Sequence, residues 1–182
     1  MSEKWYASGP FTIFDVETTG LSAVKNRIVE IAGIRIALDG SKTRFQSLVN
    51  PECRIPYYAS KVHKITDKDV QGEPTFAEVG RKFLDFIAGS VLVAHNAKFD
   101  LSFLQESLNR YGLPLWDGKT MDSIQIIRIA YPNLPSYSLQ NLRHHFGLGA
   151  NFDGPAHRAF ADVEWTEEIF AMAMQGLIDS RG

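Results

Sequence analysis

The sequence predicts an α/β domain built on a mixed β-sheet, because two kinds of apolar pattern follow each other along the chain. Three β-rich runs come first, at residues 11–17, 28–38 and 43–50. From Pro74 onward apolar residues instead recur every three or four positions, and one short apolar run at 91–95 interrupts them. Strands followed by an alternation of strands and helices are typical of α/β domains with mixed sheets.

Composition and one turn identify the first three strands. The runs FTIFDVE and IVEIAGIRIAL are rich in aromatic and β-branched residues, which pack well on a pleated sheet. The glycine-containing LDGSK separates 28–38 from 43–50 and favours an antiparallel hairpin. Residues 51–70, which two prolines interrupt, are expected to form an irregular connection. Within it, Thr66 and Asp69 have the spacing of a capping box for a short helical turn.

Five helices are expected after Pro74, because their apolar residues fit one helical face. The fifth is the long final helix, and the loops at 116–118 and 151–156 separate helices without dividing the chain into domains. The expected helices run from Phe76 to about Gly89, from Phe99 to a stop at Gly112, and over 122–131, 138–146 and 157–176.

Length and composition indicate one globular domain, residues 1–182. Hydrophobic residues make up 45% of the chain and charged residues 22%, which excludes a disordered protein. The single Cys53 excludes an internal disulfide, the start lacks an apolar signal region, and no run approaches the ~18 apolar residues of a membrane span. We therefore expect a cytoplasmic protein without membrane contact. The net charge of −2 does not decide for or against nucleic acid, because two bound divalent cations would reverse its sign.

Acidic residues lie near the ends of two expected strands. Asp15 and Glu17 project from one face of the first strand, although carboxylates are rarely buried without compensation. Asp100 follows the strand at 91–95, and ligands bind beyond the carboxyl ends of strands in open α/β sheets. Asp162 and His157, near the start of the final helix, could complete a group.

Each of these residues also has an ordinary structural explanation. A lone acid at a strand end is usually a solvated loop residue or a cap, and Asp100 alone fits a helix start. Asp162 lies among several glutamates, which is typical of a solvated helix face, and His157 alone fits a surface position. The joint occurrence of all these features favours one shared site.

Three motifs resemble those of the DEDDh 3′–5′ exonucleases, a family that includes the proofreading epsilon subunit of bacterial DNA polymerase III. They are Asp15-Val16-Glu17-Thr18-Thr19-Gly20-Leu21, His95-Asn96-Ala97-Lys98-Phe99-Asp100 and His157-Arg158-Ala159-Phe160-Ala161-Asp162. The motifs stand in the family's order, and the similarity spans roughly residues 11–175. The resemblance implies a ribonuclease H-like fold. Its five-stranded mixed sheet would have a three-strand antiparallel part, two parallel strands and flanking helices.

The resemblance also implies a reaction and its catalytic residues. The enzyme would be a metal-dependent 3′–5′ exonuclease that releases nucleoside 5′-monophosphates from DNA 3′ ends, preferably single-stranded or frayed, in proofreading or repair. Asp15, Glu17, Asp100 and Asp162 would hold two divalent cations, Mg²⁺ or Mn²⁺, for which carboxylate oxygens are suitable ligands. His157 would act as the general base.

Substrate contacts are implied for residues next to the motifs and for the segment VHKIT, which resembles a family segment whose histidine contacts the terminal nucleotide. For Phe99, stacking on a base and packing in the core both remain open. Glu30 shares a strand face with Ile28 and Ala32, and the sequence identifies no partner for its charge. The candidate substrate contacts are Thr18, Thr19, Gly20, Leu21, His63, Asn96 and Phe99.

Two alternatives to a DNA exonuclease follow from the same motifs. Oligoribonuclease and ribonuclease T share the five-residue signature, so an exoribonuclease is the first. The second is an inactive binding subunit of a polymerase complex, which predicts loss of the acidic residues, and none is lost here. A DNA polymerase subunit is accordingly a candidate partner beside the nucleic acid 3′ end, whereas a free-standing repair or trimming nuclease would need none.

Overall fold

The computed structural model describes residues 3–149 and 158–180 of the chain. Its strands are β1 (Phe11–Thr18), β2 (Ile28–Ile36), β3 (Lys42–Leu48), β4 (Val91–Ala94) and β5 (Thr120–Asp122). A 3₁₀ turn at Trp5–Ser8 precedes them, and the helices are α1 (Tyr57–His63), α2 (Asp67–Val70), α3 (Phe76–Ile87), α4 (Ala97–Arg110), α5 (Ser123–Ala130), α6 (Leu139–Phe146) and α7 (Ala159–Asp179). Three strands therefore precede an alternation of helices and strands, as the apolar patterns predict.

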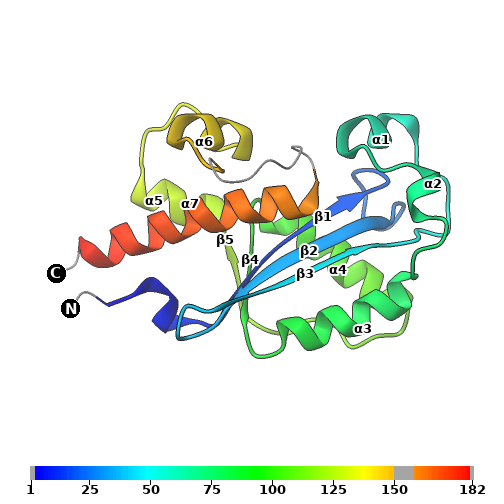
Figure 1. The fold of residues 1–182 in the computed structure, drawn as a ribbon, viewed down its shortest axis with the longest axis horizontal. Helices are drawn as coiled ribbons and strands as arrows, with labels where there is room; N and C mark the ends of the chain where they lie inside the picture. Colours follow the sequence, from blue (N-terminus) through cyan, green and yellow to red (C-terminus); the bar gives the residue numbers. More distant parts are fainter. Residues whose placement is uncertain (1–2, 150–157, 181–182) are drawn as a thin grey trace.

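The strands form one five-stranded mixed sheet in the order β3-β2-β1-β4-β5. β2 runs antiparallel to both β1 and β3, whereas β4 runs parallel to both β1 and β5. Parallel neighbours need crossover connections, and α3 and α4 provide them. In Figure 1, α3 and α4 lie on one side of the sheet and α5 and α7 on the other. The predicted fold class is confirmed.

Side-chain alternation along β1 supplies both sides of the sheet with core residues. Phe14 packs with Phe83 of α3 and Leu104 of α4, whereas Ile13 packs with Phe170 of α7. Because successive side chains of a strand point to opposite faces, the odd-numbered residues of β1 face α7. This alternation decides which helix can meet the acidic residues of β1.

The segment 51–70 is more regular than expected. Residues Tyr57–His63 form α1, which starts after Pro56 and packs Ala59 against Val29 of β2. The capping box of Thr66 and Asp69 is confirmed, since the Thr66 backbone N–H donates to Asp69 Oδ2 at 2.7 Å. The prolines of this segment therefore precede a helix instead of excluding one.

The segment 120–131 also differs from the expectation. A helix over 122–131 is wrong at its start, because Thr120–Asp122 forms β5 and the helix begins only at Ser123. The strand exists because Thr120 pairs with Leu92 of the neighbouring strand β4. The local sequence of three residues does not predict this long-range contact. The final helix begins at Ala159 and extends to Asp179 instead of ending at residue 176.

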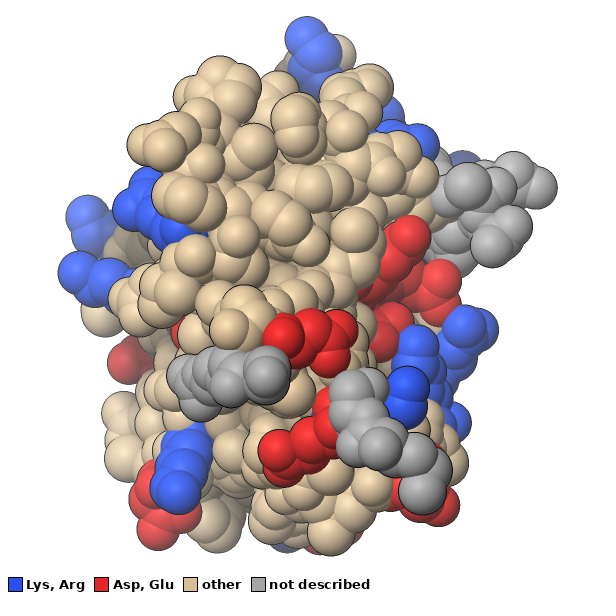
Figure 2. All heavy atoms as spheres, turned by 90° about the vertical axis from the view of Figure 1, so that its left-hand side faces the viewer, with Lys and Arg blue, Asp and Glu red and all other residues tan. Residues whose placement is uncertain are grey.

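Charge is dispersed on the end of the molecule that carries the two termini. Figure 2 shows acidic and basic side chains interspersed there around a broad uncharged area, with no continuous basic surface. Among residues 3–149 and 158–180, no helix combines the length and the apolar character that a membrane crossing needs.

Candidate metal centre and adjoining pocket

Asp15 and Glu17 lie on the face of β1 that α7 covers. They follow Ile13 at intervals of two, and they stand opposite Ala32 and Glu30 of β2. β4 pairs with β1 only as far as Ile13, so the last residues of β1 extend beyond their parallel neighbour. The two carboxylates are thus attached to a rigid strand but lie where the sheet opens.

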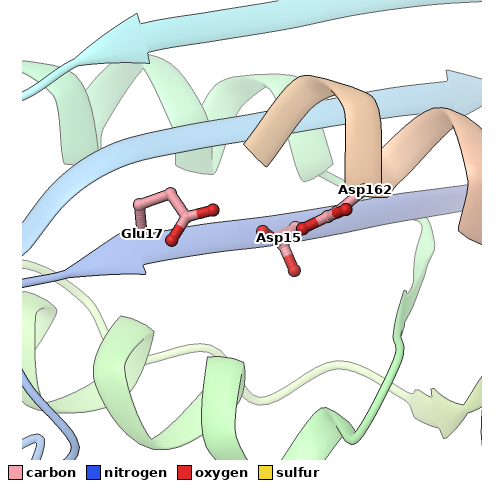
Figure 3. A group of neighbouring side chains, drawn as sticks. All are labelled: Asp15, Glu17 and Asp162. Atoms are coloured by element: carbon pink, nitrogen blue, oxygen red, sulfur yellow. The ribbon is translucent and has the colours of Figure 1, made fainter. Parts of the chain in front are cut away.

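Asp162 reaches the same place from the first turn of α7. One carboxylate oxygen each from Asp15, Glu17 and Asp162 lie within 4.8 Å of one another. Figure 3 shows Asp15 and Asp162 meeting between strand and helix, with Glu17 toward the end of β1. These three residues, here named the acidic cluster, come from segments almost 150 residues apart in sequence.

Asp100 lies beside the acidic cluster and contacts the backbone of β1 between two of its members. The Val16 N–H, between Asp15 and Glu17, donates to Asp100 Oδ1 at 3.2 Å. β4 has already turned into α4 at this level, so a side chain in the first turn of α4 takes over the pairing that a strand would supply. Asp100 is almost fully buried. Its charge therefore acts on the cluster at close range.

Burial and mutual repulsion raise the pKa values of these acids. Burial, followed by the charges of Asp100, Glu17 and Asp162, raises the pKa of Asp15 well above its ordinary value. Burial raises the pKa of Glu17 to about 9 and that of Asp100 to about 8. Without a cation, the group therefore retains protons at neutral pH.

The donor set fits a hard divalent cation. Carboxylate oxygens are the ligands that such cations prefer, and several negative charges at one point need a positive charge to become stable in the ionised form. The raised pKa values of Asp15 and Glu17 agree with this need, because a bound cation would displace the protons that these carboxylates retain.

We expect metal-free protein to lose stability as the pH rises. The pKa of Glu17 increases on folding from its ordinary 4.5 to about 9, so the protonated carboxyl stabilises the fold fully below pH 4.5. That contribution is lost as the pH rises through about 9, since the folded state binds more protons than the unfolded state throughout this window. Thermal unfolding in EDTA and in Mn²⁺ measures it: the upward shift that Mn²⁺ produces should grow with pH. A shift independent of pH would contradict this.

His95, the first residue of the second motif, and Asp122 of β5 hold this motif in place. His95 directly follows β4, and its ring nitrogens lie 2.9 Å from Ser123 Oγ and 2.8 Å from the Tyr137 carbonyl. Burial lowers the pKa of His95. Asp122 accepts hydrogen bonds from the backbone N–H groups of Asn96 and Ala97 at 3.3 and 3.1 Å, and so caps α4 from the neighbouring strand. The Asp-Ser pair before an apolar helix is an N-cap signal for α5, where Asp122 accepts the Ile124 N–H at 2.9 Å, but nothing in the local sequence indicates that Asp122 also caps α4.

An apolar pocket of about 410 Å³ adjoins the acidic cluster, and Glu17 belongs to both. Its walls come from the end of β1, from α1 and from the first turn of α4, so segments distant in sequence enclose it. Tyr58 fixes one wall, since its hydroxyl donates to the Thr19 carbonyl at 3.3 Å. The lining residues are Val16, Glu17, Thr18, Gly20, Leu21, Tyr58, Ala59, Val62, His63 and Phe99.

The candidate substrate contacts divide between pocket and scaffold. Thr18, Gly20, Leu21, His63 and Phe99 line the pocket. Thr19 is instead a buried anchor whose hydroxyl accepts the Arg27 N–H at 3.0 Å. Asn96 is exposed, with a left-handed φ of 70°, at the start of α4. Tyr58 and Val62, which the sequence analysis did not select, complete the wall that α1 contributes. His157 lies outside the described residues.

Gly20 and Phe99 each have a structural task beside the pocket. A Cβ on Gly20 would lie 2.7 Å from the Asn26 side chain, so a larger residue there would displace the amide that accepts the Ser22 N–H at 3.0 Å. Phe99 packs against the core, with its ring centroid 5.0 Å from that of Phe103, and presents its remaining surface to the pocket. Core packing and pocket lining are therefore compatible for this residue.

Comparisons with known proteins identify the family of this chain. A family model described as Exonuclease, of the RNase T type, matches residues 12–170. The DNA polymerase III subunit epsilon of Treponema pallidum is 40% identical over 162 residues, which are 88% of this chain and 74% of that protein. The PolC-type DNA polymerase III of Caldanaerobacter subterraneus subsp. tengcongensis is 36% identical over 93% of this chain, which spans only 12% of that polymerase.

A solved structure leads to the same family. Exonuclease X, in complex with 5′ overhanging duplex DNA, superposes with a TM-score of 0.69 and 28% sequence identity over 90% of both chains. Together with the family match over most of the chain, this likeness establishes the relationship. The chain belongs to the RNase T family of exonucleases.

Proposed function

We propose that this protein is a metal-dependent 3′–5′ exonuclease that removes nucleoside 5′-monophosphates from DNA, preferably from single-stranded or frayed ends. The observation that carries the proposal is the meeting of Asp15, Glu17 and Asp162 beside an apolar pocket at the end of β1. Proofreading or repair is the proposed role, and the similarity to an epsilon subunit supports it. A DNA polymerase subunit is then the proposed protein partner.

The acidic cluster would hold two divalent cations, Mg²⁺ or Mn²⁺. Bound there, the pair would lower the pKa of water and stabilise the departing 3′ oxygen. Asp15 would contribute to both ions, and Glu17 and Asp162 to one of them. Asp100, whose Oδ1 accepts the Val16 N–H, would act at the other ion mainly through water and would keep the end of β1 in register. His157 would take the proton from the attacking water.

The pocket would receive the terminal nucleotide. Its apolar walls suit a base and sugar, and Glu17 at its inner edge would place the scissile phosphate at the cluster. His63 is buried, and burial lowers its pKa, so a neutral ring is available for a hydrogen bond at neutral pH. A base enters such a pocket only when it is unpaired, which favours single-stranded or frayed ends over intact duplex.

Matched DNA and RNA oligonucleotides test the substrate preference. With Mn²⁺ present, we expect the labelled single-stranded DNA to shorten faster than the matched RNA strand. We also expect a blunt DNA duplex to be degraded more slowly than the single-stranded DNA. Timed digestion resolved on a sequencing gel measures all three rates. Equal or faster cleavage of RNA would favour an exoribonuclease, whereas an inert wild-type protein would favour a binding subunit.

A further inference from the structure

Glu30 is the most deeply buried acid near the acidic cluster, and its partners come from the start of α7. Its side chain has 0% exposed surface, and it is the third residue of β2. Arg158 donates to both carboxylate oxygens, through Nε to Oε2 at 3.0 Å and through Nη2 to Oε1 at 2.8 Å. Gln46 of β3 donates to Oε1 at 2.9 Å. The charge that the sequence left without a partner is thus fully compensated.

Glu30 also caps α7. The helix starts after Arg158, whose own side chain caps nothing and which is not a residue type that helix N-termini favour. The missing acceptor comes from across the sheet, since the Ala159 N–H donates to Glu30 Oε2 at 3.1 Å. A carboxylate at this end of the helix is also favoured by the helix dipole. One side chain therefore binds both the arginine and the backbone of the first turn.

This first turn carries Asp162. The Asp162 N–H donates to the Arg158 carbonyl at 3.2 Å. Asp162, the proposed metal ligand, is therefore hydrogen-bonded directly to the residue that Glu30 binds. On the other side, Glu30 stands directly opposite Glu17 in the register of β1 and β2. The Glu30–Arg158 pair thus connects the strand that bears Asp15 and Glu17 with the helix turn that bears Asp162.

We propose that the Glu30–Arg158 pair is a positioning pair, which sets the distance between Asp162 and the carboxylates of β1 and thereby the affinity for the metal ions. Fixed outer partners of metal ligands are generally worth ~10–100-fold in metal affinity or activity. The inference rests on the proposed metal centre. It goes further by assigning a task to two residues that would not touch metal or substrate.

Arg44–Glu164 and Lys42–Glu167 supply the comparison, because both also connect β3 to α7. Their closest atoms lie 2.6 and 2.8 Å apart, yet the basic side chains are 65% and 50% exposed. Neither pair caps α7. Arg44 also lies over the Phe160 ring in the first turn of α7, 5.1 Å from its centroid, whereas Lys42–Glu167 lies further along the helix and is therefore the matched comparison. If any ion pair between the sheet and α7 were enough to position the metal ligands, loss of any of the three pairs would lower metal affinity. We expect only the loss of Glu30–Arg158 to do so.

The test compares Arg158→Met with the double variant Glu30→Gln, Arg158→Met, and with Lys42→Met as matched control. Arg158→Met leaves a buried charge without its partner and should lower the unfolding temperature strongly. The double variant removes both charges and keeps an acceptor for Ala159, so its unfolding temperature should recover. Manganese affinity, measured by electron paramagnetic resonance, should nevertheless stay ~10–100-fold below wild type in the double variant.

Three readouts separate positioning from simple stabilisation. With a chromogenic ester of thymidine 5′-monophosphate, kcat should fall with the manganese affinity, while KM stays near wild type because the pocket belongs to other segments. Lys42→Met should change neither. Recovery of manganese affinity together with the unfolding temperature in the double variant would overturn the inference alone. Wild-type protein that binds no Mn²⁺ would overturn the proposed function and this inference with it.

Discussion

Asp15→Asn should abolish exonuclease activity without weakening the fold. The amide removes a ligand common to both proposed ions, and loss of a group at the reacting centre typically lowers kcat by about 10³-fold or more. At the same time the variant removes a carboxylate whose pKa is raised by burial and by four neighbouring acids, so repulsion in the metal-free protein decreases. The unfolding temperature in EDTA at pH 8 should therefore equal or exceed that of wild type.

Activity on a 3′-labelled strand and thermal unfolding measure the two effects on the same samples. Asp85→Asn is the matched control, because Asp85 is exposed on α3, on the other side of the sheet. It should leave both quantities unchanged. Activity that survives Asp15→Asn would contradict the assignment of Asp15, and a strongly lowered unfolding temperature would mean that the carboxylate has a structural partner.

His157→Ala should lose most turnover and keep its metal. A positioned general base contributes about 10²–10⁴-fold, and the ordinary pKa of histidine, about 6.5, suits proton transfer near neutral pH. Since the proposed ligands are all carboxylates, manganese affinity should remain close to wild type. Single-turnover kinetics gives the loss in the chemical step, and calorimetric titration gives the affinity.

His144→Ala is the control for this variant, because His144 is an exposed histidine on α6 and no proposed role involves it. It should match wild type in both assays. If His157→Ala instead loses manganese binding, His157 is a ligand or a support of the site, and the proton acceptor must be sought elsewhere.

The fold was predictable where local pattern and final structure agree. β1, β2, β3 and α3 follow from composition and from periods of two or of three and four residues. α1 did not, because seven residues that include five exposed or partly exposed side chains carry no clear apolar period. β5 did not either, since a strand of three residues exists only through its partner β4.

The sequence predicted which residues form the site, but it did not predict the contacts that hold them in position. The motifs predicted that Asp15, Glu17, Asp100 and Asp162 belong to one metal site. The structure places oxygens of Asp15, Glu17 and Asp162 within 4.8 Å of one another, and Asp100 lies beside this group. The motifs did not indicate that Asp100 holds the backbone at Val16. The partner of Glu30 lies 128 residues away in sequence, and no local rule identifies a contact of that kind.

A crystal structure with Mn²⁺ and thymidine 5′-monophosphate, analysed by anomalous scattering, tests the central claim most directly. The account predicts two manganese peaks beside Asp15, with Glu17 and Asp162 as further ligands of one of them and the nucleotide in the pocket next to Glu17. Manganese found only at other acidic residues, or no manganese at the end of β1 at saturating concentration, would contradict it.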